Sequence, residues 1–125
     1  MAQRVFQQSY HVPGTLTANI TITFTAPFDC TLLHVSACAS NDSAALLTIG
    51  DSDDGDEFLT SSEIGDSGTP VEFDGDDFVD TSGNSHNRYY PRIADGTVVI
   101  ITLDYDGDGG TAADDFTIVL TFAEG

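Results

Sequence analysis

The sequence predicts an all-β fold, an antiparallel β-sandwich of about seven or eight strands with a jelly-roll-like arrangement. Three observations support this prediction: apolar and polar residues alternate in several segments, turn residues separate these segments, and no segment has a helical period. The chain has 125 residues, of which 40% are hydrophobic, and this is enough for one core. Because neither a linker nor an internal repeat divides it, residues 1–125 are predicted to form a single β-sandwich domain.

The first predicted strand spans residues 16–24, where every second side chain is apolar and the others are threonine or asparagine. Such a period of two buries one face of a strand and leaves the other face in water. Pro27 ends the strand, because proline cannot donate a hydrogen bond to a neighbouring strand. The next two predicted strands span residues 31–39 and 44–49.

The middle of the chain, residues 51–87, gives a weaker strand signal. Aspartate, glycine and serine surround three short apolar pieces, at residues 58–59, 71–73 and 78–79. These pieces fit either short edge strands or parts of one long excursion.

Two further strands are predicted towards the C-terminus, at residues 97–103 and 116–122. Residues 98–101 are apolar on both faces, which is typical of a central strand, and the even-numbered residues of the second segment form one apolar row. An acidic loop, residues 104–115, joins the two segments. Together with residues 16–24, these two segments are predicted to be the central strands.

The charge of the chain excludes several classes of partner. Twenty-one acidic residues face three arginines and no lysine, so that the formal net charge is −18. Such a surface repels phosphate backbones and anionic membranes, so we expect neither nucleic acid nor membrane as a partner. The acidity fits either multivalent cation binding or adaptation to a salty medium, and an aspartate-rich chain without lysine favours the second. Residues 1–9 contain no long apolar run and predict no secretory signal.

One acidic motif has the form of a calcium-binding loop. Asp104, Asp106 and Asp108 precede Gly109 in the pattern D-x-D-x-D-G, and Asp115 takes the twelfth position. Calcium is therefore the one cofactor that the sequence suggests. The alternative is a solvated hairpin loop, which we favour because strands flank the motif and position twelve normally holds the longer glutamate. The acidic segments 51–57 and 74–77 are interpreted as solvated turns.

A basic and aromatic cluster stands apart from the acidic segments. Arg88, Tyr89, Tyr90 and Arg92 hold two of the three positive charges beside two tyrosines. Tyrosine and arginine are enriched among residues that anchor protein interfaces, so these four are candidate interface residues. The alternative is a loop that pins itself to the acidic surface of its own domain.

The sequence predicts no enzyme. His11, His34 and His86 are scattered outside any metal-binding motif, and the chain has neither a nucleophile-elbow sequence nor a phosphate-binding glycine loop. If Cys30 and Cys38 lie on one extended strand, they are too far apart for a disulfide, and they are expected to be buried thiols.

Several segments follow one another in a particular order: Ala-Pro-Phe-Asp-Cys-Thr-Leu at residues 26–32, Thr-Ile-Gly at 48–50, Asp-Glu-Phe-Leu at 56–59 and Ile-Ala-Asp-Gly-Thr at 93–97. This order resembles that of small structural proteins of tailed phages and related viruses, including head decoration proteins. The resemblance implies a jelly-roll-like sandwich on the capsid exterior of a virion, commonly a homotrimer, that binds the major capsid protein and has no catalytic residues.

Two functions from different classes therefore follow from the sequence. The first is a viral structural protein, a capsid decoration or cement protein that stabilises the assembled shell by binding its exterior. The alternative is a calcium-dependent β-sandwich module that binds carbohydrate or protein through the acidic loops and the tyrosine pair.

Overall fold

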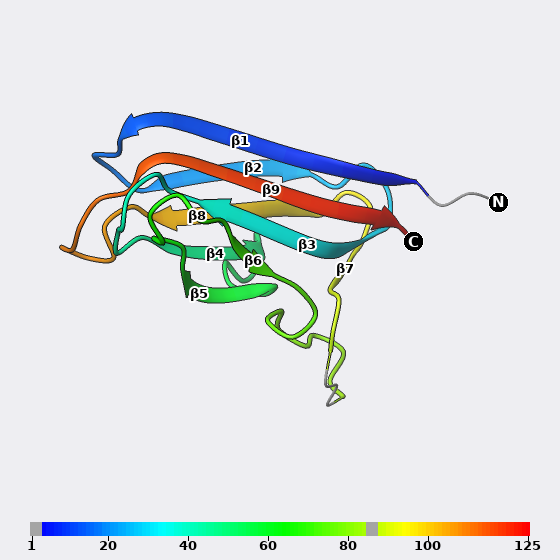
Figure 1. Cartoon of the computed structure of the whole chain (residues 1–125). Coiled ribbons are helices and arrows are strands. Elements are labelled where there is room, and N and C mark those ends of the chain that lie inside the picture. The colour runs from blue at the N-terminus through cyan, green and yellow to red at the C-terminus, as the bar shows by residue number, and fades with distance from the viewer. Residues whose placement is uncertain (1–3, 85–87) are drawn as a thin grey trace.

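The computed structural model describes residues 4–84 and 88–125 and consists of two antiparallel sheets packed face to face (Figure 1). Nine strands lie within these residues: β1 (Val5–Thr15), β2 (Ile20–Thr25), β3 (Cys30–Cys38), β4 (Leu46–Asp51), β5 (Leu59–Glu63), β6 (Val71–Phe73), β7 (Arg92–Ile93), β8 (Val98–Asp104) and β9 (Asp114–Glu124). The predicted all-β sandwich is confirmed, with one strand more than the upper end of the predicted number. No helix in the described part of the chain is long and apolar enough to cross a membrane.

The connectivity is jelly-roll-like. One sheet has the strand order β1-β9-β3-β6, with β7 also paired to β3, and the other has the order β2-β8-β4-β5. Strands β1 to β4 therefore alternate between the sheets, and the last two long strands, β8 and β9, return to the interior of the two sheets. Every pairing is antiparallel.

The core lies between the two sheets and consists of side chains that alternate along the inner strands. In β9 the even-numbered residues from Phe116 to Phe122 are fully buried, while Thr117, Val119 and Thr121 on the other face are partly exposed. In β8, Val99, Ile101 and Leu103 are buried in the same way. The alternating apolar residues that predicted these strands are thus the residues that face the opposite sheet.

The predicted strand at residues 16–24 is shorter than expected and is not central. It begins at Ile20, and β2 lies at the edge of its sheet, next to β8 alone. Leu16 is buried, yet its backbone N–H donates to the Ala113 carbonyl, 3.0 Å away, in the turn before β9. The apolar alternation therefore continues through a connection that belongs to neither sheet. The other two segments predicted to be central, β8 and β9, do lie between neighbouring strands.

The first strand of the structure, β1, was not predicted. It pairs with β9 from Val5↔Ala123 to Val12↔Phe116 and forms the edge of its sheet. Pro13 follows at a point where the register shifts, a position at a sheet edge where a missing N–H is tolerated. At the other end Arg4 forms an ion pair with Glu124, and its guanidinium lies 4.1 Å from the centre of the Phe28 ring.

The middle of the chain, where the strand signal is weak, contains both of the alternatives predicted from its sequence: short edge strands and a longer excursion. Two of the short apolar pieces belong to edge strands, β5 and β6, whereas Phe78 lies in a turn within a longer excursion and is 6% exposed. The Phe78 ring contacts Tyr90 edge to face, with ring centres 6.4 Å apart. Burial of this aromatic side chain attaches the excursion to the sandwich.

The two cysteines lie at opposite ends of β3 and are both free thiols. Cys30 is buried as predicted, and its burial, together with the charge of Asp29, raises the pKa of its thiol. Cys38 is only half-buried, because it lies on the outer face of the sheet, and this corrects the prediction that both would be buried.

Candidate functional site

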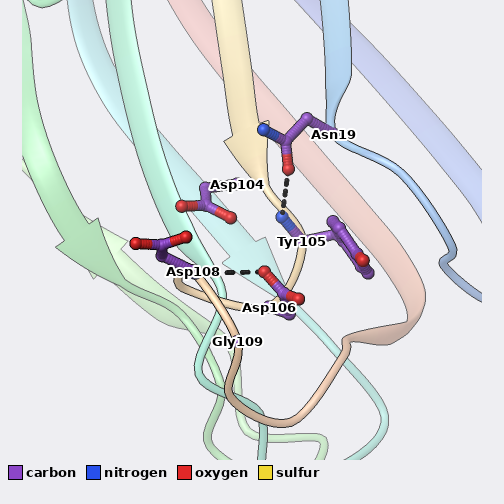
Figure 2. Close-up of a pocket in the computed structure, with 6 residues that line it drawn as sticks. All are labelled: Asn19, Asp104, Tyr105, Asp106, Asp108 and Gly109. Atoms are coloured by element: carbon purple, nitrogen blue, oxygen red, sulfur yellow. Dashed lines mark hydrogen bonds between the residues drawn. The ribbon is translucent and has the colours of Figure 1, made fainter.

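The predicted calcium loop forms a shallow hollow beyond the end of β8. Asp104, Asp106 and Asp108 line it together with Asn19, Tyr105 and Gly109 (Figure 2). The Asn19 side-chain oxygen accepts a hydrogen bond from the Tyr105 N–H at 3.2 Å, and Asp106 Oδ1 accepts one from the Asp108 N–H at 3.0 Å. Three of the four predicted ligands are therefore gathered by one tight turn.

The fourth predicted ligand, Asp115, has partners of its own. Its Oδ1 accepts a hydrogen bond from the Gly14 N–H at 2.7 Å, and its Oδ2 accepts one from the Ser40 hydroxyl at 2.9 Å. These bonds, that from Gly14 first, hold the pKa of Asp115 below its usual value. The carboxylate of Asp115 thus links the ends of β1 and β3 to β9 and is not among the residues that line the hollow.

The hollow stabilises one of its carboxylates in the charged form. Partial burial acts to raise the pKa of Asp106, but hydrogen bonds from the backbone N–H groups of Gly109 and Asp108 outweigh it and lower that pKa. The negative charge of Asp106 in turn raises the pKa of Tyr105. Across the described residues, no group of three or more histidine, cysteine, aspartate or glutamate side chains has an arrangement that would hold a metal ion.

Substitution of Asp108 distinguishes a solvated loop from a calcium site. Asp108 has a positive φ of 70°, a conformation that asparagine adopts more readily, and Asp108→Asn also removes one of three neighbouring charges. We expect the variant to be more stable than the wild type by about 0.5 kcal/mol or less, measured by thermal melting in sodium chloride. A specific stabilisation of the wild type by millimolar calcium, against an ionic-strength-matched sodium control, that disappears in Asp108→Asn would contradict the solvated loop.

The candidate interface residues Arg88 and Tyr90 contact their own domain. The Arg88 guanidinium donates to Asp76 Oδ2 at 2.8 Å and to the Tyr90 hydroxyl at 2.9 Å, and it lies 3.3 Å from Asp74 Oδ2. The bond with Tyr90 and the charge of Asp76 raise the pKa of Arg88. These contacts attach the loop to the acidic surface of its own domain, which is the arrangement that the sequence analysis gave as the alternative to an interface.

The other two candidates, Tyr89 and Arg92, lie on either side of Pro91. The Tyr89 hydroxyl is 2.7 Å from Thr81 Oγ1, and its backbone N–H donates to the Gly75 carbonyl at 2.8 Å. Arg92 is exposed on β7 and lines a small hollow with Asp29, Ile93 and Ala94. The structure thus gathers Arg88, Tyr89 and Tyr90 around the 74–77 turn, and it places Arg92 in a different surface region.

Carboxylates repel one another in the 51–57 turn. A hydrogen bond with Asp54 and the charge of that neighbour raise the pKa of Asp56, and the same hydrogen bond lowers the pKa of Asp54. Partial burial, a hydrogen bond with Asp54 and the charge of Asp51 raise the pKa of Glu57. The raised pKa values mean that the charged forms of Asp56 and Glu57 are less stable in the folded chain than they are in water.

Added salt is therefore expected to stabilise the fold. The Debye length falls from about 30 Å at 0.01 M to about 3 Å at 1 M, so that monovalent salt screens the repulsion among 21 carboxylates. The melting temperature should rise steadily as sodium chloride increases over this range, as followed by circular dichroism. A flat curve would show that bound counter-ions or local hydrogen bonds already offset the repulsion.

The two histidines among the described residues, His11 and His34, have separate polar partners. His11 Nδ1 lies 2.7 Å from Thr117 Oγ1, on the outer face of the β1–β9 pair, and His34 Nε2 lies 3.2 Å from Glu72 Oε1. His86 lies outside the described residues. Within the described ranges no polar or charged residue is buried, so these residues contain no enclosed polar site.

Comparison with known proteins identifies a similar fold. Neither a protein-family model nor a curated protein sequence matches the chain. Among solved structures, a chain of the capsid asymmetric unit of cyanophage Pam1 superimposes with a TM-score of 0.56 at 15% sequence identity. The match covers 98% of this chain and 85% of the phage chain. At this identity the likeness shows that the two chains share their fold.

Proposed function

We propose that this chain is a structural protein of a viral capsid, which acts by binding rather than by catalysis. The observation that carries the proposal is the likeness of its whole sandwich to a chain of a phage capsid asymmetric unit, which extends over 98% of its length. The order of segments that resembles head decoration proteins points in the same direction.

Within the capsid, we propose the role of a decoration or cement protein on the outside of the shell. The partner is then the major capsid protein, and the chain acts as a homo-oligomer, for which we favour a trimer. The charge supports an outer position, because the interior of a filled capsid holds concentrated nucleic acid and a chain of formal charge −18 is repelled by phosphate.

Stabilisation of the shell follows from linkage. A protein that binds the assembled shell but not the free subunits shifts the equilibrium towards the shell. At a concentration about a hundred times its dissociation constant, it contributes about 2.7 kcal/mol for each site. This mechanism requires a complementary surface but no catalytic residue.

The test is direct binding to shells. Purified chain is added to DNA-free shells of the major capsid protein from the virus that encodes it, and both are sedimented through a density gradient in molar sodium chloride. We expect the chain to sediment with the shells, to raise their melting temperature and to leave naked DNA unbound. If the chain stays at the top of the gradient at every concentration tested, the proposed function is wrong.

The calcium-dependent binding module is not advanced as a second function. It requires a cation at the hollow beside β8, and Asp115, the fourth expected ligand, is hydrogen-bonded elsewhere. The tyrosines expected to contact its ligand, Tyr89 and Tyr90, are hydrogen-bonded through their hydroxyls to Thr81 and Arg88.

A further inference from the structure

One edge of the sandwich exposes part of its hydrophobic interior. Strands β1 and β2 are the edge strands of the two sheets and lie along the same side of the molecule (Figure 1). Neither strand, both of which the structure describes in full, contains a fully buried residue. Their inward-facing apolar side chains are only partly buried, and we call this group the open seam: Phe6, Tyr10, Val12, Ile20, Ile22 and Phe24.

The two halves of the open seam meet across the sandwich. The ring of Phe122, on β9, stacks against Phe6 with ring centres 4.9 Å apart and contacts Phe24 edge to face at 5.6 Å. Phe6 and Phe24 thus flank the same core ring from two different sheets. The two halves of the seam are therefore joined at this point through one core ring.

The opposite edge of the sandwich is closed. Beside β5 and β6, Phe58, Ile64, Phe73 and Phe78 are between 0% and 7% exposed. Phe58, Ile64 and Phe78 lie outside the strands, so the connecting segments themselves cover that edge. Apolar core side chains are thus left partly exposed at the β1–β2 edge but are covered at the β5–β6 edge.

The two strands of the open seam carry no carboxylate of their own. All 21 acidic residues lie at or after Asp29, so that the first 28 residues carry a formal charge of +1 from Arg4 and the remainder, with two arginines, carries −19. Both edge strands fall entirely within the segment that lacks carboxylates. The two large hydrophobic residues that are exposed among the described ones, Val5 at 62% and Val98 at 38%, lie on the outer faces of the two sheets near this edge: Val5 is in β1, and Val98 pairs with Thr25 of β2.

We propose that the open seam is the surface through which one copy of this chain binds a second copy. Two bodies of charge −18 repel each other wherever carboxylates meet, and contact between the two seams keeps every carboxylate out of the facing strands. A contact of one patch with the same patch is also the commonest arrangement in homo-oligomers. The inference rests on the proposed self-association and names the surface that forms it; because a contact of one patch with the same patch has two-fold symmetry, this contact makes a dimer and not a trimer.

The physical gain comes from burial of the seam. Covering its partly buried aromatic and aliphatic side chains removes apolar area from water, which favours association. In each sheet the edge strand pairs on one side only, β1 with β9 and β2 with β8 among the described strands, so backbone groups on the free side are open to a second copy. Because the formal charge of −18 on each copy opposes association, salt should strengthen the contact.

The test is the oligomeric state of three charge variants in 1 M sodium chloride, measured by sedimentation equilibrium. Gln8→Glu adds one charge to the inward face of β1 without changing shape, and Thr23→Asp adds one to the exposed face of β2. Thr60→Asp is the matched control, an exposed threonine on β5 at the far edge of the same sheet as Thr23. Circular dichroism melting checks that each variant is folded.

We expect the wild type and Thr60→Asp to self-associate, and both variants in the strands that bear the seam, Gln8→Glu and Thr23→Asp, to self-associate at least about tenfold more weakly. If Gln8→Glu does not fold, Thr23→Asp alone decides, because its side chain is exposed. A folded wild type that stays monomeric, or equal weakening in Thr60→Asp, overturns the inference. The inference is also overturned if the wild type is monomeric and Thr23→Asp abolishes its binding to shells, because the seam then contacts the shell and not a second copy. Self-association without any binding to shells would overturn the proposed function alone.

Discussion

Ile118→Asp is expected to unfold the domain under conditions in which the wild type is fully folded. Ile118 is 0% exposed and lies in β9 between Tyr10 of β1 and Ala37 of β3. A carboxylate at this position would be surrounded by apolar side chains, with no described polar residue buried nearby to pair with it. The loss should exceed about 4 kcal/mol, a large part of the roughly 5–15 kcal/mol that stabilises a typical domain.

The measurement is far-ultraviolet circular dichroism with urea titration in 1 M sodium chloride, where general repulsion is screened. Ile118→Val is the control, since it removes one methyl group without adding charge and should lose only about 0.5–1.5 kcal/mol. If Ile118→Asp keeps a cooperative transition near the wild-type midpoint, residue 118 faces water. The register of β9 would then differ by one residue, because a shift of one exchanges the two faces of a strand.

The inner strands could be predicted from sequence because burial on one face and water on the other imposes the period that the sequence shows. In β9 this period holds without interruption from Phe116 to Phe122, and in the structure each apolar member of the row is buried. The predicted bounds differ from the observed ones by up to two residues for residues 97–103 and 116–122. At such ends the hydrogen bonding continues after the apolar pattern has stopped.

The edge strands could not be predicted equally well, because an edge buries less and so demands less of its sequence. In β1 the inward-facing row contains Gln8 among its apolar residues, and none of its side chains is fully buried. In β2 the alternation is strict, yet it says nothing about whether a second neighbour exists. The period of a strand reports the two faces of its sheet, whereas edge or central position depends on pairing between residues distant in sequence.

The candidate sites show the same limit. The turn that gathers Asp104, Asp106 and Asp108 is local, and its carboxylates do line one hollow. The partners of Asp115 are Gly14 and Ser40, which are distant in sequence, and no spacing rule within the motif could reveal them. The contacts of Arg88 with Asp74 and Asp76 also cross a turn that lacks a regular pattern. The open seam was missed because it is formed by strands from two sheets.

The last prediction concerns the acidic loop after β8, which is attached to the domain more firmly than its charge suggests. The Ala44 N–H donates to the Thr111 carbonyl at 2.9 Å, and the Asn41 side chain donates to the Ala112 carbonyl at 2.8 Å. Gly107 and Gly109 both have positive φ, at 62° and 101°. A Cβ added to Gly107 would lie 2.1 Å from the Ala44 carbonyl oxygen, whereas one added to Gly109 would have no atom within 4 Å.

Gly107→Ala and Gly109→Ala therefore separate backbone strain from steric contact. Each places a Cβ in the left-handed region, at a cost of about 1–2 kcal/mol. Gly107→Ala must in addition push the loop away from a backbone oxygen, which adds about 1–3 kcal/mol, and so we expect it to lose about 3–5 kcal/mol in urea titration. Gly109→Ala should lose about 1–2 kcal/mol. Equal, small losses in both variants would mean that the loop moves freely away from Ala44. A much larger loss in Gly107→Ala would mean that the turn bearing Asp104, Asp106 and Asp108 is held in place by the fold, whether or not it binds an ion.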